Sequence, residues 1–554
     1  MQIKLIAFNG RYIHSCLALF YVREELRRHL PEAAVDLHQF TINDPYYATL
    51  LKISAGAPAV VMFSVYIWNG ELVARLLADL ALALPETIFV LGGPQAENLE
   101  MGGMAPRVVR VLGPVEGLPT QFYVDLDRGR PAPEYRGGSG QPFPSPYRDA
   151  DLAGELAHRQ VYYESVRGCP FACSYCLSSI DRGMVWKELA EVERELAQIL
   201  AHRPGIIKFV DRTFNAQPER ALAIWRFLAP RVGATVCHFE MAPDLFTEEM
   251  FAFLAELPPG IFQFELGIQS THPATLARVN RRMDLAQAGE NLRRLAALDN
   301  IHLHADLILG LPGDTGATFQ ESLRQVFAMN PHHIQMGLLK ILPGTAISGE
   351  PGLVHARRPP YEVLATDCLD HAALAELYWL GECVEAFHNN RYFPSLFAWL
   401  REGGEDIAAF FAGLLELCRA RNFFSRAATQ ELLTELLSEF TAGRADGALL
   451  RELLTYDWLH CGHHHLPKAL GASTDLVTWR ESLASALPLN LAPYYDYRSR
   501  ADFFRKVRFL PMSSAALQAV GLTEGGQAGS VAFLPEKSPA LQGWQKTVFF
   551  PARA

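Results

Sequence analysis

Three cysteines within eight residues are the part of this sequence best suited to chemistry. The segment reads Arg167-Gly-Cys169-Pro-Phe-Ala-Cys173-Ser-Tyr-Cys176, so the thiols are separated by three and by two residues. Three thiolates at this spacing can hold three irons of a cubane cluster and leave the fourth iron without a protein ligand. An open metal position can chelate a small molecule. The alternative is a zinc knuckle, which needs a fourth cysteine or histidine, and none follows closely.

The cysteines follow the first of six strand-like segments that alternate with amphipathic segments. Strands are predicted at residues 162–167, 206–211, 235–240, 262–269, 303–309 and 334–342, and helices at 188–202, 218–228, 248–257, 286–298 and 318–329. Six strand–helix repeats are fewer than the eight of a closed barrel. Residues 156–345 are therefore predicted to form an open, partial (β/α)6 barrel whose site lies at the carboxyl ends of the strands.

A separate α/β domain is predicted over residues 1–128. Apolar strands at 3–8, 35–40, 60–65, 88–91 and 108–112, with helices such as 17–30 and 72–84, indicate a doubly wound, five-stranded parallel sheet. Residues 129–155, rich in Pro, Gly and Ser in their first part, are predicted to be a linker. Helical patterns at 366–387, 408–418, 429–440 and 448–459 predict a mainly α domain over residues 346–554, which we expect to close over the barrel mouth.

Four strands of the N-terminal sheet end in glycine or polar residues. These ends are Asn9-Gly10, the segment 64–69, Gly92-Gly93-Pro94 and the segment 113–117. Glycine lets a backbone approach a large ligand closely, although each pair alone could be no more than a tight turn. Four such ends on one sheet favour a ligand pocket there.

Composition limits the class of protein. The chain has 554 residues, 49% of them hydrophobic, and 60 acidic against 50 basic side chains, for a formal net charge of −10. These values exclude wholesale disorder and a disulfide-stapled miniprotein, and they disfavour non-specific nucleic-acid binding. No apolar run reaches the ~18 residues of a membrane span, and the first residues do not resemble a secretory signal. We expect a cytoplasmic protein with reduced thiols and no membrane partner.

The cysteine motif on this architecture resembles the radical S-adenosylmethionine (SAM) superfamily. The resemblance implies a [4Fe–4S] cluster on Cys169, Cys173 and Cys176, whose open iron binds the amino and carboxylate groups of SAM. Residues beside the third cysteine or at strand ends would contact SAM: Tyr175, Asp211, Glu240, Glu265, Gln269, Ser270 and Asp306. The alternative for each acidic residue alone is an ordinary solvated or salt-bridged carboxylate.

Residues 1–128 resemble the cobalamin-binding domain that precedes the barrel in one branch of the superfamily, and the whole chain resembles a subgroup with an uncharacterised C-terminal domain. The residues that would contact cobalamin are Asn9, Ser64, Tyr66, Trp68, Asn69, Gly92, Gly93, Pro94, Gly113 and Glu116. The last loop departs from the Gly-Glu-Gly-Glu usual there. The Asp-x-His-x-x-Gly that supplies a cobalt ligand in other cobalamin domains is also absent around His14. We predict that no protein histidine ligates cobalt.

The resemblance implies a class B methyltransferase that methylates an unactivated carbon through a 5′-deoxyadenosyl radical and methylcobalamin. It implies a small-molecule or unknown substrate and an external electron donor such as flavodoxin or ferredoxin, and it assigns no catalytic residue. One alternative keeps both cofactors for a rearrangement, cyclisation or oxidation; another is a non-catalytic cobalamin or redox sensor. Methylthiolation would need a second cluster in the N-terminal domain, where Cys16 is the only cysteine.

Three weaker signals favour structural roles. The histidine-rich segment 460–465 matches no standard metal spacing, and Cys368, Cys383, Cys418 and Cys461 lack Cys-x-x-Cys pairs. A basic, aromatic stretch from Tyr494 to Arg508 could contact RNA. Contact with an RNA substrate is less favoured for this stretch than an ordinary charged face that pairs with an acidic surface of the protein.

Overall fold

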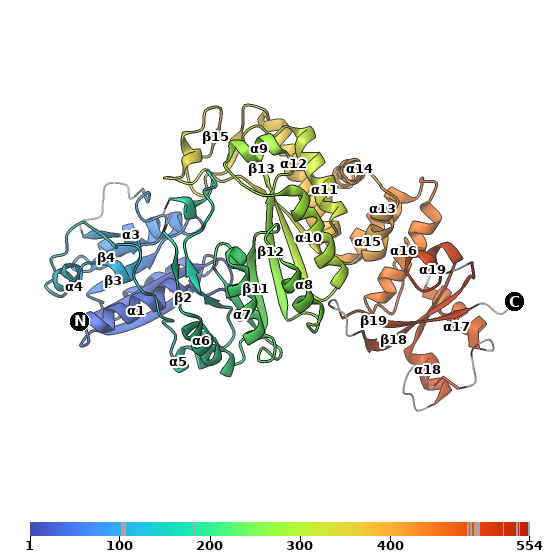
Figure 1. The fold of residues 1–554 in the computed structure, drawn as a ribbon, viewed down its shortest axis with the longest axis horizontal. Helices are drawn as coiled ribbons and strands as arrows, with labels where there is room; N and C mark the ends of the chain where they lie inside the picture. The colour runs from blue at the N-terminus through green and yellow to red at the C-terminus, as the bar shows by residue number, and fades with distance from the viewer. Residues whose placement is uncertain are drawn as a thin grey trace.

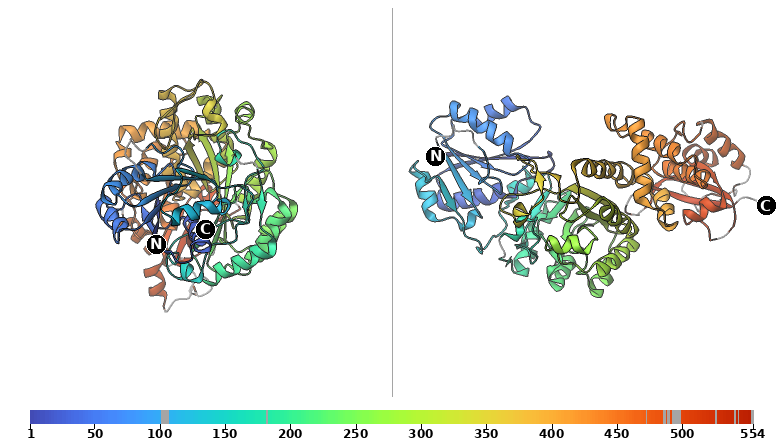
Figure 2. Two further views of the ribbon diagram at one scale, coloured as in Figure 1. Left: turned by 90° about the vertical axis from the view of Figure 1, so that its left-hand side faces the viewer. Right: turned by 90° about the horizontal axis from the view of Figure 1, so that it is seen from above.

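A computed structural model gives the fold, and four units follow one another along its long axis (Figures 1 and 2). It describes the whole chain except residues 101–106, 181–182, 472, 485–486, 488–489, 492–498, 525, 539–540, 542 and 552–554. The aromatic part of the segment considered for RNA, Tyr494 to Arg498, lies outside the described residues. None of the described helices is both long and apolar enough to cross a membrane.

The N-terminal unit is a parallel sheet with the strand order β2-β1-β3-β4-β5-β6. Its strands are β1 (Gln2–Asn9), β2 (Ala34–Thr41), β3 (Val60–Ser64), β4 (Ile88–Gly92), β5 (Val108–Leu112) and β6 (Glu134–Arg136). Its helices are α1 (Leu17–His29), α2 (Tyr46–Ser54), α3 (Gly70–Ala83) and α4 (Thr120–Asp127). Alternate strand residues pack on α1 and α4 at one face and on α2 and α3 at the other. This two-sided burial is why the strands are apolar throughout.

The sheet has six strands, not the predicted five, and the sixth strand lies within the segment predicted to be a linker. Residues 134–136 form a sixth strand that pairs in parallel with β5. Only Tyr135 of this strand is buried, with its ring 5.0 Å from that of Phe122, so the segment lacks the apolar run that marks a buried strand. The same segment also holds the short helix α5 (Asp149–Ala153), which is tied to α1 by the Arg23–Asp151 ion pair.

The second unit is an open parallel sheet with the order β7-β10-β11-β12-β13-β14. Its strands are β7 (Val161–Tyr163), β10 (Ile206–Phe209), β11 (Val236–Met241), β12 (Phe262–Gln269), β13 (His302–Leu309) and β14 (His333–Leu338). Its helices are α6 (Leu189–Ala201), α7 (Pro218–Leu228), α8 (Glu248–Ala255), α9 (Pro273–Arg278), α10 (Leu285–Leu298) and α11 (Gly316–Ala328). The predicted first strand divides: β8 (Val166–Arg167) leaves the barrel and pairs antiparallel with β9 (Val185–Trp186).

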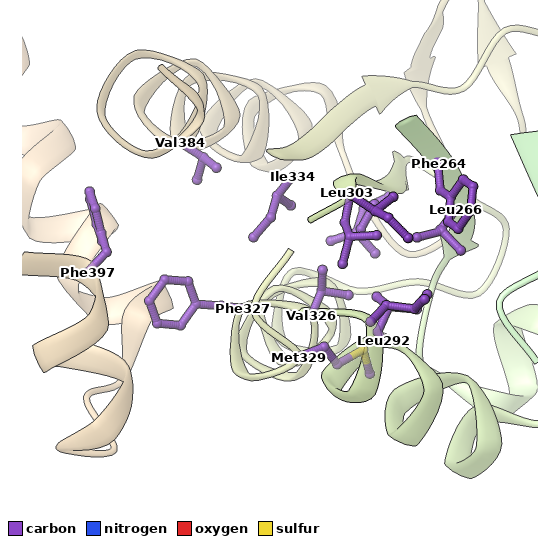
Figure 3. Close-up of a cluster of buried hydrophobic side chains, with 14 of the residues drawn as sticks. Phe264, Leu266, Leu292, Leu303, Val326, Phe327, Met329, Ile334, Val384 and Phe397 are labelled. Atoms are coloured by element: carbon purple, nitrogen blue, oxygen red, sulfur yellow. The ribbon is translucent and has the colours of Figure 1, made fainter. Parts of the chain in front are cut away.

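Strand residues of the barrel alternate between a buried apolar side and a half-buried polar side. The apolar side packs on the helices, as Figure 3 shows for Phe264, Leu303 and Leu292. The same core continues from Phe327 of α11 to Phe397 in the next unit, with 6.3 Å between ring centroids. The polar side faces the lumen and supplies the side chains of the candidate site.

The C-terminal part is helical and then ends in a sheet. Its helices are α12 (His371–Val384), a π-helical turn η5 (Glu385–Asn389), α13 (Pro394–Glu402), α14 (Ile407–Ala420), α15 (Gln430–Thr441), α16 (Gly447–His460), α17 (Ser473–Ala484), α18 (Arg500–Lys506) and α19 (Ser514–Ala519). The strands β17 (Arg508–Met512), β18 (Gly529–Lys537) and β19 (Gln545–Pro551) form an antiparallel sheet that the sequence analysis did not predict. In the segment 460–465, His463 stacks on Trp458 with 3.9 Å between ring centroids.

Of the region 346–554, which is expected to close over the barrel mouth, the segment before α12 lies at the mouth, whereas the first helices pack at the side of the barrel. The helix α12 and the turn η5 pack along the edge strand β14. The intervening segment, with β15 (Val354–His355) and β16 (Val363–Ala365), lies at the carboxyl end of β13, where Val363 covers Gly310. It also reaches the sheet domain, because Gln95 Nε2 donates a hydrogen bond to Tyr361 Oη.

We predict that Asp151→Ala lowers the free energy of unfolding by about 3 kcal/mol, because it removes the buried carboxylate that accepts from both Nη atoms of Arg23. The two side chains are only 8% and 11% exposed. Chemical denaturation measures the change, with Glu24→Ala as the control. Glu24 is 30% exposed and pairs with the same arginine, so its loss should cost less than about 1 kcal/mol. Equal losses in the two variants would contradict the prediction.

Candidate functional site

The three cysteines lie in the loop between β8 and β9, and all three line one cavity of about 200 Å³. Backbone contacts from two other parts of the barrel support the loop: Ser174 N donates to Val279 O at 2.9 Å, and Ile347 N donates to Ser174 O at 3.0 Å. Gly168 begins the loop with a φ of +94°, and a side chain there would collide with the carbonyl of Gly183. The loop is therefore held in one shape from three sides.

The donor set suits a cluster better than a single ion. Among the described residues, no three His, Cys, Asp or Glu side chains are gathered closely enough to hold one metal ion. A cubane is a larger group whose thiolates bind at separate irons, so three cysteines around one cavity fit a [4Fe–4S] cluster.

A buried arginine that the sequence analysis missed lies beside the cysteines. Arg281 Nη1 is 3.7 Å from Cys173 Sγ, and its Nη2 donates to the Gly267 carbonyl. Burial opposes its charge, but Tyr175 and Cys173 raise the pKa of Arg281 above its usual value. It comes from the turn after α9, a turn that is fixed by a hydrogen bond of 2.8 Å from Asn280 Nδ2 to Ala172 O. The sequence signal was weak: Arg281 is one of two arginines in an unremarked loop.

Three predicted carboxylates meet on the wall of the same cavity. Glu240, Glu265 and Asp306 come from the neighbouring strands β11, β12 and β13. Burial opposes the charge of Glu265, but His238, at 3.0 Å, and Lys208, at 3.3 Å, lower its pKa to about 2.

Asp306 is the opposite case. Burial and the charges of Glu265 and Glu240 raise the pKa of Asp306 well above its usual value. Its Oδ1 is buried and has no hydrogen-bond partner among the described residues, although His304 Nε2 is 3.3 Å away. An orphaned buried oxygen beside an ionised carboxylate and an open cavity fits a polar, cationic ligand such as SAM.

The remaining residues predicted to contact SAM divide into two groups. Tyr175 and Gln269 line the cavity. Asp211 and Ser270 do not, and both are fully buried. Asp211 Oδ1 accepts hydrogen bonds from the backbone N–H of Ser165, at 2.7 Å, and of Val166, at 3.1 Å. Asp211 thus anchors the strand that leads into the cluster loop, and direct SAM contact stays a prediction for the others.

A second, larger cavity of about 590 Å³ lies between the carboxyl edge of the N-terminal sheet and the cluster loop. Predicted cobalamin contacts that line it are Ser64, Gly92, Gly93, Gly113 and Glu116. It extends between the sheet and the helices α1 and α4, where its walls are apolar or aromatic: Leu19, Val22, Leu26, Met62, Val90, Phe122 and Tyr123. A cavity that opens at the sheet edge and continues into an apolar interior fits a flat macrocycle with a buried tail.

Five of the predicted cobalamin contacts do not line this cavity: Asn9, Tyr66, Trp68, Asn69 and Pro94. Asn69 holds the loop after β3, accepting from Tyr66 N at 2.8 Å and donating to Ser64 O at 3.1 Å. Trp68 stacks on Tyr66 at 4.3 Å. These residues shape the sheet edge. His14 does not line the cavity either.

Gly92, which ends β4, and Gly93, which follows it, are glycine for different reasons. Gly93 has a φ of +101°, and a Cβ there would lie 2.6 Å from Val65 O, so its backbone position excludes a side chain. A Cβ on Gly92 would have Val111 O, at 3.9 Å, as its nearest neighbour. Gly92 therefore borders open space in the cavity.

An ion-pair cluster lies on the wall of the larger cavity, next to the start of the cluster loop. Arg167 Nη2 donates to Glu116 Oε1 and to Glu164 Oε2, both at 2.9 Å. The guanidinium carbon lies 4.4 Å from the ring centroid of Phe143. Ser178 and Arg212 line both cavities. Ligands held in the two cavities would thus face each other across these residues.

Comparison with known proteins shows which families and proteins this chain is similar to. The sequence model of the Radical SAM superfamily matches residues 163–326, and a model described as a protein of unknown function (DUF4080) matches residues 350–487. The chain is 23% identical over 426 residues to the cobalamin-dependent radical SAM methyltransferase TokK of Streptomyces tokunonensis, covering 66% of the chain and 62% of TokK. It is 25% identical over 285 residues to a tRNA-2-methylthio-N(6)-dimethylallyladenosine synthase of Psychrobacter cryohalolentis, covering 47% of the chain and 56% of that enzyme.

Among solved structures, the chain resembles the cobalamin-dependent S-adenosylmethionine radical enzyme OxsB with aqua-cobalamin bound. The TM-score is 0.58 at 14% sequence identity, covering 82% of the chain and 80% of OxsB. At this identity the likeness shows the fold: a sheet domain, then a barrel. The chain spans about three fifths of the length of the curated relatives it matches.

We predict that Arg281→Gln makes the cluster harder to reduce while iron content stays unchanged. The guanidinium lies beside a cysteine thiolate and stabilises the added electron, so its loss should lower the midpoint potential by on the order of 50–100 mV. A redox titration followed by electron paramagnetic resonance measures this. Arg282→Gln, at the exposed neighbouring position, is the control. The variant with all three cysteines changed to Ala should hold no cluster. An unchanged potential in Arg281→Gln would contradict the prediction.

Proposed function

Residues 163–326 form a radical SAM domain, and we propose that the chain is a cobalamin-dependent radical SAM methyltransferase acting on an unactivated carbon of a small molecule. The observation that carries this proposal is the meeting of two cavities at Ser178 and Arg212. One cavity is bounded by the cysteines of the cluster loop, and the other by the carboxyl edge of the sheet domain.

The chain's own residues would bind and align the reactants. When bound, the cluster with SAM supplies hydrogen-atom abstraction and cobalamin supplies the methyl group. Cys169, Cys173 and Cys176 would hold the cluster. The ionised Glu265 would attract the positively charged part of SAM, and Asp306, when protonated, would donate a hydrogen bond to an oxygen or nitrogen acceptor of SAM. The substrate carbon would lie near Arg212, between the two cavities.

The sheet domain supports cobalamin binding in two ways. Gly92 leaves room at the sheet edge for a macrocycle. The depth between the sheet and α1 and α4 is apolar enough to take the tail base. The relative TokK and the structurally similar OxsB, both described as cobalamin-dependent, support the same assignment. An external donor such as flavodoxin or ferredoxin would reduce the cluster.

The support for methyl transfer over the alternatives comes from the similarity to methyltransferases such as TokK, and no single residue of the chain decides it. A rearrangement, cyclisation or oxidation would use the same two cavities. A sensor would not require the cysteines and carboxylates to share one cavity. The tRNA methylthio synthases match about half of the chain, but Cys16 is the only cysteine before Cys169. The chain therefore lacks the N-terminal cysteines for a second cluster.

The products formed from SAM test the function. The reconstituted holoenzyme, supplied with SAM carrying a deuterated methyl group, a reductant and a small-metabolite extract, should form S-adenosylhomocysteine and 5′-deoxyadenosine in comparable amounts. A metabolite should gain the labelled methyl group. Formation of 5′-deoxyadenosine with almost no S-adenosylhomocysteine would support the non-methylating alternative. Absence of both with a reduced cluster would support the sensor.

We predict that Gly92→Leu reduces bound cobalamin at least several-fold while leaving the cluster at about four irons per chain. Leucine would fill the cavity at the sheet edge without meeting the backbone. Extraction and absorbance of cobalamin measure the change. Gly205→Leu is the matched control, since Gly205 is exposed and has open space around it. Full cobalamin content in a folded Gly92→Leu protein would place the binding site elsewhere.

A further inference from the structure

A third cavity, of about 310 Å³, lies at the opposite end of the barrel from the cluster. Its described walls are Gly260, Gln263, His302, Asn389, Asn390, Arg391 and Leu541. Gln263 is at the start of β12 and His302 at the start of β13, whereas the cluster cavity uses Gln269 and Asp306 near the other ends. Six residues of strand separate Gln263 from Gln269, or about 20 Å. This basal cavity is therefore separate from the proposed active site.

The cavity contains the guanidinium of Arg391, which has no ion-pair partner among the described residues and lies over the Trp544 ring, with 5.8 Å from Cζ to the ring centroid. Arg391 Nε is buried and has no hydrogen-bond partner among the described residues, and no acidic side chain is among the described walls. The acidic residue that influences it, Asp299, is exposed and lies 4.0 Å from His332 instead. Burial lowers the pKa of Arg391 to about 10, so the guanidinium still carries its charge at neutral pH. A half-buried guanidinium without an acidic partner is costly unless a ligand compensates its charge.

The arginine is held in place by groups that are themselves satisfied. Asn389 accepts from Ile334 N and donates to Ile334 O, both at 2.9 Å, which fixes the turn to β14. Asn390 Oδ1 accepts from Tyr392 N at 2.9 Å. Arg391 itself has a φ of +60°. The turn that follows the π-helical segment thus places Arg391 in a left-handed conformation.

Two neutral polar side chains complete the wall. The side chains of Gln263 and His302 take part in no hydrogen bond among the described residues. His302 stacks on His332 with 5.3 Å between ring centroids. Burial and the neighbouring His332 and Arg391 lower the pKa of His302 to about 3, so it is a neutral donor at physiological pH. The far side is closed by Leu541, which contacts Gly260 from the C-terminal sheet region.

We propose that the basal cavity binds the oxyanion of a small ligand, a carboxylate or a phosphate group, through Arg391 with His302 and Gln263 as neutral donors. A guanidinium whose Nε has no hydrogen-bond partner among the described residues matches the two oxygens of such a group. The volume, about 310 Å³, leaves room for further atoms beyond the anion. Because the walls come from the barrel and from the C-terminal region, the ligand would join these two parts of the chain.

The test is anion binding by the full-length protein, without SAM turnover, so it stands or falls apart from the proposed function. Calorimetry and thermal melting would use inorganic phosphate, glycerol phosphate or succinate, with sodium chloride keeping the ionic strength constant. At least one probe should bind saturably and raise the melting temperature. Preference for either phosphate probe or for succinate identifies the anion, and tighter binding of glycerol phosphate than of inorganic phosphate indicates an organic ligand.

Arg391→Gln should weaken that binding at least tenfold, and Arg391→Lys should weaken it less, because lysine keeps the charge but loses the planar fork. Arg194→Gln, on the exposed face of α6, is the matched charge control and should bind as the unaltered protein does. Gln263→Met leaves the arginine in place and should weaken binding several-fold, which gives a result even where Arg391→Gln does not fold. The absence of saturable binding by any probe would overturn the proposal. So would equal binding by all variants.

Discussion

The ion pair between Arg167 and Glu116 is the interaction on which the arrangement of the two cavities depends. Glu116 lies in the last loop of the sheet domain and is only 7% exposed, so it requires a cation. Arg167 provides it from a position two residues before Cys169. Burial opposes the charge of Arg167, but Glu164 and Glu116 together raise its pKa, so it stays charged. One buried charge cluster therefore sets the distance between the sheet edge and the cysteines.

The polar lumen of the barrel distributes charge unequally among its carboxylates. Glu265 has His238 and Lys208 within 3.3 Å and keeps its charge, whereas Asp306 has no hydrogen-bond partner among the described residues and is driven toward its protonated form. Two carboxyl groups on adjacent strands thus offer one charged acceptor and one neutral donor. A site for a cationic ligand that also has hydrogen-bond acceptors can use both: the charged carboxylate attracts the cation, and the neutral carboxyl group donates a hydrogen bond.

The sequence predicted the elements with a regular hydrophobic period and the site marked by closely spaced cysteines. The period-2 and period-3.6 patterns located most barrel strands and helices to within a few residues, and the cysteine spacing predicted the radical SAM domain that the family match confirms. What failed depends on contacts rather than on pattern. The strand β6 has a single buried residue, Tyr135, and exists because β5 offers an open edge. Asp211 has the residue type of a ligand contact, but the backbone of Ser165 and Val166 occupies it. Arg281 and Arg391 come from turns, where no periodicity marks which way a side chain points.

The inward register of the barrel strands also explains why two separate sites arise on the same elements. On β13, positions 302, 304 and 306 alternate with buried apolar residues and so face the lumen together. At the carboxyl end this row meets the cluster loop. At the amino end it meets the turn that carries Arg391. A ligand at the amino end is too distant to take part in chemistry at the cluster, and it would act on the contact between the barrel and the C-terminal region. The C-terminal helices pack along the edge strand β14, and the segment around Tyr361 lies at the mouth, so the C-terminal region contacts the barrel at its base, its side and its mouth. In the proposed function, selection of the substrate would fall to the residues that the two upper cavities share.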